Sequence, residues 1–366
     1  MLQEILISTA TNITQIAVIK NSILTEITIE RNDSLLGNIY KGQIIRVLPG
    51  MKAAFVNIGL KQPAFLQSDC SIHQGQILLT QVIKEPVKKK QARLTTRISI
   101  PSRYIILLPY SPNLLKISNR IKSIKERQRL KDIFLSKVSK YGLIIRTVAE
   151  DVQEKLLLDD LEFLYNLWQD IQYTSRNSLI YKELPIYLQI TRDLVEPSKI
   201  KVDSHDIFQK INGFSKRFIN TLDIEYYSEK RPLFDLYSIN INNLLESKVT
   251  LISGGYIIME STESMTTIDV NTGSYIGENN LTETIFKTNS EAAITIANQL
   301  QLRSISGIII IDFIDMKNNE HKKQVLAILK QALVDDYVKI SNISELGLVE
   351  MTRRYTRDSL EQILCR

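Results

Sequence analysis

The chain has 366 residues, of which 44% are hydrophobic and 23% are charged, and it carries a formal net charge of +6. This length predicts several structural units rather than one core, and the composition excludes a disordered or fibrous chain. No run approaches the ~20 apolar residues of a membrane span, and the N-terminal residues alternate like a strand without a basic leader. We therefore expect neither a membrane span nor a targeting signal.

Short strands separated by turn residues are predicted for residues 38 to 84, a pattern that favours a small barrel. Phe55 and Phe65 occur there among lysines, which is typical of an OB-type barrel that stacks nucleobases on aromatic rings beside a basic groove. Because Phe55 stands between Ala54 and Val56, a place in the barrel core is the alternative for this residue.

Residues 98 to about 197 change to a mixed pattern of strand, basic helix, strand and a long amphipathic helix from about 150 to 176. The second strand, "YGLIIRTV", ends on Arg146 and Thr147. A guanidinium next to a hydroxyl can clasp a phosphate group. The alternative is a strand that simply leaves the core for solvent.

Three basic stretches are spread along the chain: "KEPVKKKQARLTTR", "KISNRIKSIKERQRLK" and "MTRRYTR". They suit a partner with a phosphate backbone, and each is also compatible with a solvated surface. Charge alone therefore does not decide whether the chain binds nucleic acid.

The segment "SMTTIDVNTGSYIG", residues 264 to 277, alternates as a strand and places Asp269 and Asn271 on one face before a Thr-Gly turn. Downstream, Ile308 to Ile311 form a β-branched run that predicts a fully buried strand ending on Asp312. The residues between them show helical spacing. The region is therefore predicted to be a strand-helix-strand unit with parallel strands.

Parallel neighbouring strands would bring Asp269 and Asp312 to the same edge of a sheet, where α/β proteins place their ligands. Two carboxylates and the amide oxygen of Asn271 suit a hard divalent cation such as magnesium. The alternative is that each aspartate only caps a loop, and residue chemistry does not decide between the two.

Several stretches together resemble the bacterial and plastid ribonuclease E/G family of endoribonucleases. "SGGYIIMESTESMTTIDVNTG", "ETIFKTNSEAA", "SGIIIIDFIDM" and "LGLVEMTRRYTRDSLEQIL" are similar to its catalytic core. "GNIYKGQIIRVLPGMKAAFVNIG" is similar to its RNA-binding barrel, and "YGLIIRT" to its pocket for a 5′-monophosphate. The similarity extends over essentially the whole chain.

The resemblance implies an α/β multidomain fold. In it, a ribonuclease-H-like domain (residues 1–35 and 198–244) is interrupted by an OB-fold, S1-like barrel (36–97) and a 5′-sensor region (98–197). A DNase-I-like α/β catalytic domain (245–366) follows. The residues that match functional positions of the family are the magnesium ligands Asp269 and Asp312, the orienting residue Asn271, the RNA-stacking Phe55 and Phe65, and the 5′-phosphate clasp of Arg146 and Thr147.

The sequence also departs from the family. Family members carry a C-P-x-C pair just beyond the position of Cys365 that links two subunits through zinc, but this sequence stops at Arg366. Zinc and the tetramer built on it are thus unsupported by the residues present, and we expect a homodimer. Cys70 and Cys365 themselves indicate reduced, unlinked thiols.

Ser274 replaces a basic residue usual in the family. The barrel lacks a long insertion, which favours the compact G-like type.

We therefore expect a magnesium-dependent endoribonuclease that cuts single-stranded RNA, such as mRNA and rRNA precursors. The resemblance implies products with 5′-phosphate and 3′-hydroxyl ends and a preference for 5′-monophosphorylated substrates. A non-catalytic RNA-binding scaffold is the alternative, but the intact acids count against it, and a phosphatase of small nucleotides would not need the barrel. The Ile-, Asn- and Lys-rich composition suggests an AT-rich genome, and hence a plastid stroma or a bacterial cytoplasm.

Overall fold

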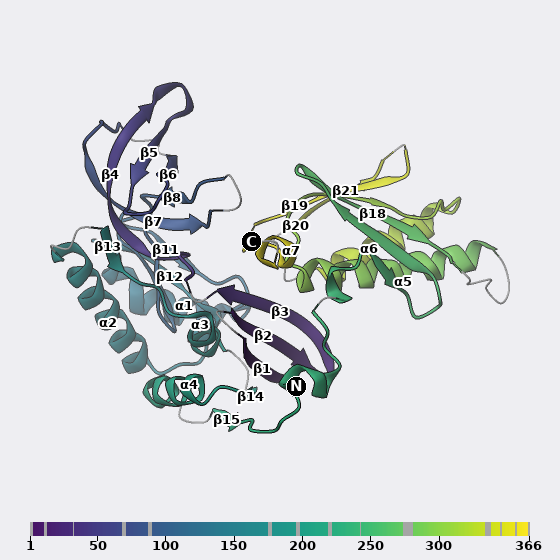
Figure 1. Cartoon of the computed structure of the whole chain (residues 1–366), viewed down its shortest axis with the longest axis horizontal. Helices are drawn as coiled ribbons and strands as arrows, with labels where there is room; N and C mark the ends of the chain where they lie inside the picture. Colours follow the sequence, from purple (N-terminus) through teal and green to yellow (C-terminus); the bar gives the residue numbers. More distant parts are fainter. Residues whose placement is uncertain are drawn as a thin grey trace. The chain divides into compact units, whose positions relative to one another are not determined.

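A computed structural model describes the chain except for residues 1–2, 11–12, 32, 68–70, 87–89, 175–177, 195–197, 219–221, 242, 274–280, 334–337, 345, 356 and 365–366. The chain divides into two compact units, Met1–Thr14 with Glu30–Tyr227, and Gln15–Ile29 with Ser228–Arg366 (Figure 1). None of the helices in the described ranges has both the length and the apolar composition needed to cross a membrane.

A five-stranded sheet joins segments that lie far apart in the sequence. Its strands are, in spatial order, β15 (Asp223–Tyr226), β14 (Ser198–Val202), β1 (Gln3–Ala10), β2 (Ile13–Lys20) and β3 (Ile23–Arg31). Strand β14 pairs in parallel with both β1 and β15. Helix α4 (His205–Phe218) packs on β14 and β15, and α3 (Ile186–Asp193) packs on α4. Everything between β3 and β14 is therefore an insertion into this sheet.

The insertion begins with a barrel. Its strands are, in order, β4 (Ile39–Leu48), β5 (Ala53–Asn57), β6 (Ala64–Gln67), β8 (Arg93–Thr95) and β7 (Ile77–Lys84). The ring closes because β7 also pairs with β4, and β13 (Ser178–Tyr181) adds to β4. Small and branched side chains such as Ala54, Val56 and Leu66 fill the interior. The predicted small barrel is confirmed.

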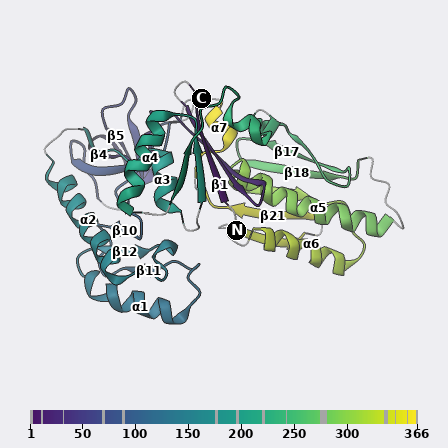
Figure 2. The same cartoon turned by 90° about the horizontal axis from the view of Figure 1, so that it is seen from below.

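A four-stranded sheet and two helices make up the rest of the insertion. The strands are β11 (Leu115–Ile117), β12 (Gly142–Ile145), β10 (Ile105–Leu108) and β9 (Ile100–Pro101). Helices α1 (Ile124–Phe134) and α2 (Glu154–Tyr173) pack against them (Figure 2). Phe134 and Trp168 are fully buried in their shared core. The predicted long helix is confirmed, with ends slightly inside those expected.

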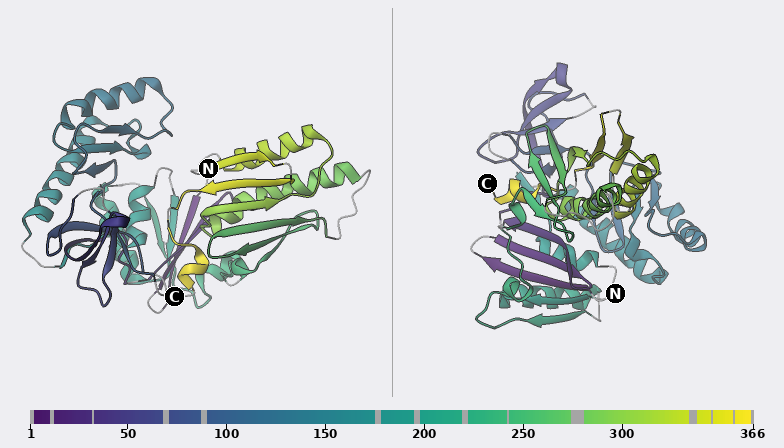
Figure 3. Two further views of the ribbon diagram at one scale, coloured as in Figure 1. Left: turned by 90° about the horizontal axis from the view of Figure 1, so that it is seen from above. Right: turned by 90° about the vertical axis from the view of Figure 1, so that its right-hand side faces the viewer.

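The second unit contains a six-stranded sheet. Its strands are, in order, β16 (Lys248–Thr250), β17 (Tyr256–Ser261), β18 (Met265–Asn271), β19 (Gly307–Asp312), β21 (Leu348–Arg353) and β20 (Val338–Ile343). Helices α5 (Leu281–Leu302) and α6 (Asn319–Ala332) cover one face, and the short α7 (Leu360–Leu364) follows β21 in the chain (Figure 3). The 3-10 helices are η1 (Pro49–Met51), η2 (Leu135–Lys137), η3 (Thr147–Ala149), η4 (Leu233–Tyr237) and η5 (Asn243–Leu245).

The predicted strand-helix-strand unit is confirmed, because β18 and β19 are parallel neighbours connected through α5. The prediction of a fully buried strand at Ile308 to Ile311 is wrong. Ile309 and Ile311 are buried against the helices, but Ile308 is 48% exposed. The helices cover only one face of the sheet, so alternate isoleucines point toward and away from the core.

Candidate functional site

Asp269 and Asp312 lie side by side at the ends of β18 and β19. The two residues are direct register partners in the parallel ladder. Both side chains are exposed, whereas their neighbours Ile268 and Ile311 are buried on the helix side of the sheet. The alternation of the strands therefore places both carboxylates on the face opposite the helices.

Asn271 belongs to the same group. Its Nδ2 donates a 2.7 Å hydrogen bond to Oδ2 of Asp269, two positions earlier on the same face of β18. The bond fixes the orientation of the Asp269 carboxylate. The turn that follows requires glycine, because Gly273 has φ +57° and an added Cβ would lie 2.7 Å from the carbonyl oxygen of Gly254.

A hollow of about 250 Å³ lies beside the two acids, and Glu260, Thr267 and Leu348 contribute to its walls. Burial raises the pKa of Asp312, and the carboxylates of Asp269 and Asp315 raise it further. Like charges at close range disfavour ionisation. The site therefore concentrates negative charge at one point of the sheet surface.

This donor set fits a magnesium ion. Magnesium takes oxygen ligands and is usually held by one or two carboxylates while it keeps several waters. Among the described residues no group of three or more His, Cys, Asp or Glu side chains gathers in a way that would suit a metal fully enclosed by protein. Two adjacent carboxylates and an amide on an open face leave room for water and substrate.

A buried asparagine supports the loop after Asp312, and sequence reasoning did not identify it. Asn289 of α5 is 0% exposed. Its Nδ2 donates to the carbonyl oxygen of Ile314 at 2.8 Å, and its Oδ1 accepts from the Ile314 amide at 3.1 Å. These two bonds fix the loop that carries Asp315. The sequence feature that could have identified Asn289 is its position on the apolar side of the predicted helix.

Phe55 and Phe65 are register partners on β5 and β6, with ring centroids 6.1 Å apart in an edge-to-face arrangement. Both are half-buried and neither belongs to the barrel core, which contains their neighbours Ala54 and Leu66. The alternative that placed Phe55 in the core is therefore wrong. The two rings form an aromatic surface on the outside of the barrel that a nucleobase could contact.

Arg146 follows β12, and groups of the chain already bind its guanidinium. Its Nη1 donates to the carbonyl oxygen of Ser102 and to Oδ1 of Asp193, both at 2.7 Å. Burial alone would raise the pKa of Asp193, but hydrogen bonds from Arg146 and Arg192 hold it below its ordinary value. The ion pair is thus maintained over the physiological pH range.

Thr147 lies next to Arg146 and shares a 2.8 Å hydrogen bond with the hydroxyl of Ser118. The structure therefore gives the predicted guanidinium and hydroxyl separate partners, Asp193 and Ser118, which sequence reasoning did not identify. Asp193 lies nearly fifty positions after β12 in the sequence, so no local sequence pattern could link it to Arg146. Three residues discussed from the sequence, Cys70, Ser274 and Cys365, lie outside the described part of the chain.

The chain is similar to known ribonucleases. The model of the ribonuclease E/G family matches residues 99–356. Ribonuclease G of Salmonella typhimurium is 43% identical over an alignment covering 100% of this chain and 82% of that protein. Ribonuclease G of Haemophilus influenzae is 42% identical, covering 99% and 81%. Ribonuclease E of Nostoc sp. is 36% identical, covering 92% of this chain and 54% of that protein.

The family model spans well over half of the chain, and the two ribonuclease G relatives align with essentially all of it. The barrel, the strand-helix-strand unit and the acid pair are the features expected from the resemblance of the sequence. The chain belongs to the ribonuclease E/G family of endoribonucleases.

Proposed function

We propose that this endoribonuclease depends on magnesium and cuts single-stranded RNA at the Asp269–Asp312 pair. The observation that carries the proposal is the register pairing of two exposed carboxylates on adjacent parallel strands, with Asn271 bonded to one of them. Repulsion between the acids is relieved by a bound cation.

In this proposal Asp269 and Asp312 hold the metal through carboxylate oxygens, and the Asn271 amide keeps Asp269 in the binding orientation. Bound magnesium would supply a Lewis acid and an activated water for attack on the phosphodiester. The hollow beside the acids would receive the phosphodiester group that is cut. The family resemblance supports products with a 5′-phosphate and a 3′-hydroxyl.

The barrel would hold the substrate through Phe55 and Phe65. Base stacking on aromatic side chains does not require a particular sequence and suits unpaired bases. The partial exposure of both rings supports this role, because a ring enclosed in the core could not reach a base.

Arg146 and Thr147 would recognise a 5′-terminal monophosphate. Asp193 and Ser102 both contact Nη1, and within the described residues Nε and Nη2 have no hydrogen-bond partner, so an incoming phosphate would bind there. Asp193 would then act as a positioning residue that holds the guanidinium plane. A terminal phosphate would add charge-assisted hydrogen bonds that a 5′-hydroxyl cannot make.

The proposal includes the architecture implied by the resemblance: a ribonuclease-H-like domain of residues 1–35 and 198–244, the S1-like barrel of 36–97, the sensor region of 98–197 and a DNase-I-like domain of 245–366. Strand β14 returning to β1, and a sheet covered on one face by α5 and α6, support it. We propose a homodimer as the assembly, and mRNA and rRNA precursors as substrates.

A cleavage assay tests the proposal. The protein is mixed with a 5′-monophosphorylated single-stranded RNA in magnesium or in EDTA, and the product ends are mapped. We expect cleavage only with magnesium and ligatable 5′-phosphate ends. Binding of RNA without cleavage under all metal conditions would instead identify a scaffold. If Asp315→Asn removes activity while Asp312→Asn retains it, the loop acid is the ligand instead.

A further inference from the structure

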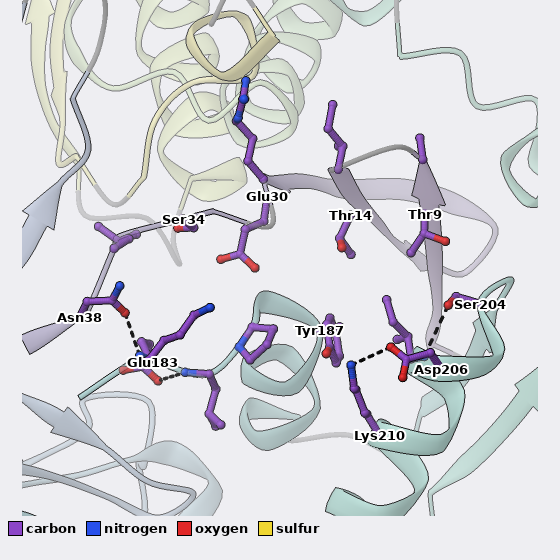
Figure 4. A pocket seen from close by; sticks show the side chains of 18 residues that line it. Thr9, Thr14, Glu30, Ser34, Asn38, Glu183, Tyr187, Ser204, Asp206 and Lys210 are labelled. Carbon is purple, nitrogen blue, oxygen red and sulfur yellow. Dashed lines mark hydrogen bonds and ion pairs between the residues drawn. The ribbon is translucent and has the colours of Figure 1, made fainter. Parts of the chain in front are cut away.

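A cavity of about 380 Å³ lies within the first unit, and none of the residues proposed for cleavage, stacking or phosphate recognition contributes to it. The ends of β1 and β3 and the start of β2 form one wall, and the segment before α3 and the start of α4 form the other (Figure 4). Its size is in the range of small-molecule sites.

Hydroxyl groups and charged side chains share the polar part of the wall. Thr9, Thr14, Ser34, Ser204 and Tyr187 all line the cavity. Figure 4 shows the Glu30 carboxylate directed between the two walls, with Ser34 and Thr14 on either side of its stem. Hydroxyl oxygens accept hydrogen bonds as well as donate them. The region around Glu30 is therefore rich in acceptors.

Glu30 differs from Lys210, Asp206 and Glu183 in its partners. Lys210 pairs with Asp206 at 2.6 Å, and Glu183 pairs with Arg192 at 3.5 Å. Glu30 accepts a 2.7 Å hydrogen bond from the backbone amide of Ile186. Within the residues that the structure describes, it forms no ion pair with a lysine or an arginine.

The surroundings of Glu30 are unfavourable for its negative charge. Burial is the main reason that its pKa is raised to about 7, and Glu85 and Glu183 contribute to the rise. The hydrogen bond from Ile186 and the charge of Lys182 oppose it. Tyr187 also faces this charge from α3. An external cation would relieve the cost of ionising Glu30.

We propose that this cavity binds a small organic cation whose ammonium or guanidinium group contacts the Glu30 carboxylate. The hydroxyls of Ser34 and Thr14 would accept its remaining N–H donors. The acids Glu30, Glu183 and Asp206 line the cavity together with the bases Arg31, Lys182 and Lys210, so its formal charge is balanced. Because Asp206 pairs with Lys210 and Glu183 with Arg192, the preference for a cation is confined to the Glu30 carboxylate. The inference goes beyond the proposed nuclease function and does not depend on it.

Binding would be linked to protonation. A cation favours the ionised form of Glu30, which is only partly ionised near neutral pH in the empty site. Binding at pH 7 should therefore release a fraction of a proton per ligand, and affinity should increase as the pH rises toward 8. A cation attracted only to surface charge would release no proton at this pH.

The test is calorimetric titration of the full chain with 1,4-diaminobutane and with agmatine, at constant ionic strength and without magnesium. The neutral 1,4-butanediol, which has the same carbon chain, is the control ligand. We expect saturable one-to-one binding of at least one amine, no binding of the diol, and proton release that is evident from the heats in buffers of different ionisation enthalpy.

Glu30→Gln should weaken the binding at least 10-fold while the chain stays folded, because glutamine keeps the acceptor for Ile186 and resembles protonated Glu30. Glu162→Gln, an exposed position on α2, should leave affinity unchanged. The proposal is overturned if neither amine saturates the wild type at millimolar concentration, if the diol binds equally well, or if Glu30→Gln keeps wild-type affinity. Displacement of the amine by equimolar magnesium would identify a metal site instead.

Discussion

The acid pair on β18 and β19 and the arginine after β12 carry opposite charges, and they differ in whether the chain supplies a partner of opposite charge. Arg146 is already paired with Asp193 and bonded to the Ser102 carbonyl oxygen. Asp269 and Asp312 lie next to each other, and in the described part of the chain neither forms an ion pair with a lysine or arginine. The positive charge of Arg146 is therefore compensated by a carboxylate of the same chain, whereas the acid pair keeps an excess of negative charge.

The difference indicates what each site requires from outside. The acid pair needs a cation to become neutral, so its function should be lost entirely without metal. Arg146 already shares the Asp193 carboxylate with Arg192, so a phosphate must share the guanidinium with Asp193. Its contribution should be a preference among substrates rather than an absolute requirement. Substitutions at the two sites, and then at Phe65 and Glu30, test and extend this contrast.

The largest effect is expected for Asp312→Asn, and equally for Asp269→Asn. Each change removes one negative ligand from the pair, so cleavage should fall by more than about 100-fold at any practical magnesium concentration. RNA binding in EDTA should stay within a few-fold of wild type, because the barrel is unchanged. Single-turnover cleavage rates across a magnesium titration measure this.

Combining both substitutions should cost little more than either alone, since the two acids act as one site. Near-normal cleavage by either variant at low magnesium would show that its aspartate is only a loop cap, and the contrast with Arg146 would disappear.

Arg146→Ala should reduce the preference for a 5′-monophosphate. Loss of a charge-assisted contact is worth on the order of 1.5–3 kcal/mol, which corresponds to roughly a 10- to 100-fold slower cleavage of the phosphorylated RNA. The 5′-hydroxyl substrate should be cut at nearly the wild-type rate. Initial rates at subsaturating RNA compare the two substrates.

Arg129→Ala is the matched control for this prediction, because Arg129 also forms an ion pair within the same region, with Glu126 at 2.7 Å. It should leave the ratio of the two rates unchanged. Equal rates for both substrates with the wild-type protein would remove the case for a sensor.

Phe65→Ala should weaken binding of single-stranded RNA by about 1–3 kcal/mol, the usual contribution of one stacked base. The melting temperature should change little, because the ring is half-buried outside the core. Leu66→Ala provides the opposite pattern: a fully buried core residue whose loss lowers the melting temperature while the folded fraction binds RNA normally. Fluorescence anisotropy and thermal unfolding of the two variants test this pair of outcomes.

The smallest effect concerns Glu30, a third type of site: its carboxylate is largely buried near Lys182, and among the described residues the two form no ion pair. Its pKa is raised from 4.5 to about 7, so the folded chain binds more protons than the unfolded chain between these pH values. The free energy of unfolding should therefore fall as the pH rises through this window, by less than about 3 kcal/mol.

Glu30→Gln should remove this part of the pH dependence. Relative to wild type, the variant should gain a few degrees of melting temperature at pH 8 and little at pH 4.5. A difference in melting temperature between wild type and variant that does not change with pH would contradict a raised pKa of Glu30.

The strand-helix-strand unit and the proximity of its two aspartates could be predicted because both depend on local periodicity: period two along the strands and helical spacing between them. The exposure of Ile308 could not be predicted, since it depends on which face of the sheet the helices cover. The pairing of Arg146 with Asp193 and the cavity at Glu30 could not be predicted either, because each is formed by segments that are far apart in the sequence. Roles for individual residues came from the family resemblance rather than from periodicity.

The pairing of β1 with β14 affects how the chain folds during synthesis. Gln3 is paired with Ser198, so the first strand emerges from the ribosome long before its parallel neighbour exists. At about 5–20 residues per second this delay is roughly 10–40 s. In the barrel and the four-stranded sheet most strands pair with strands close in sequence, so both can fold in that interval. During the same time the apolar strand β1 has one edge without its partner strand. A chaperone that protects nascent chains would therefore be most useful to this protein before residue 198 is translated.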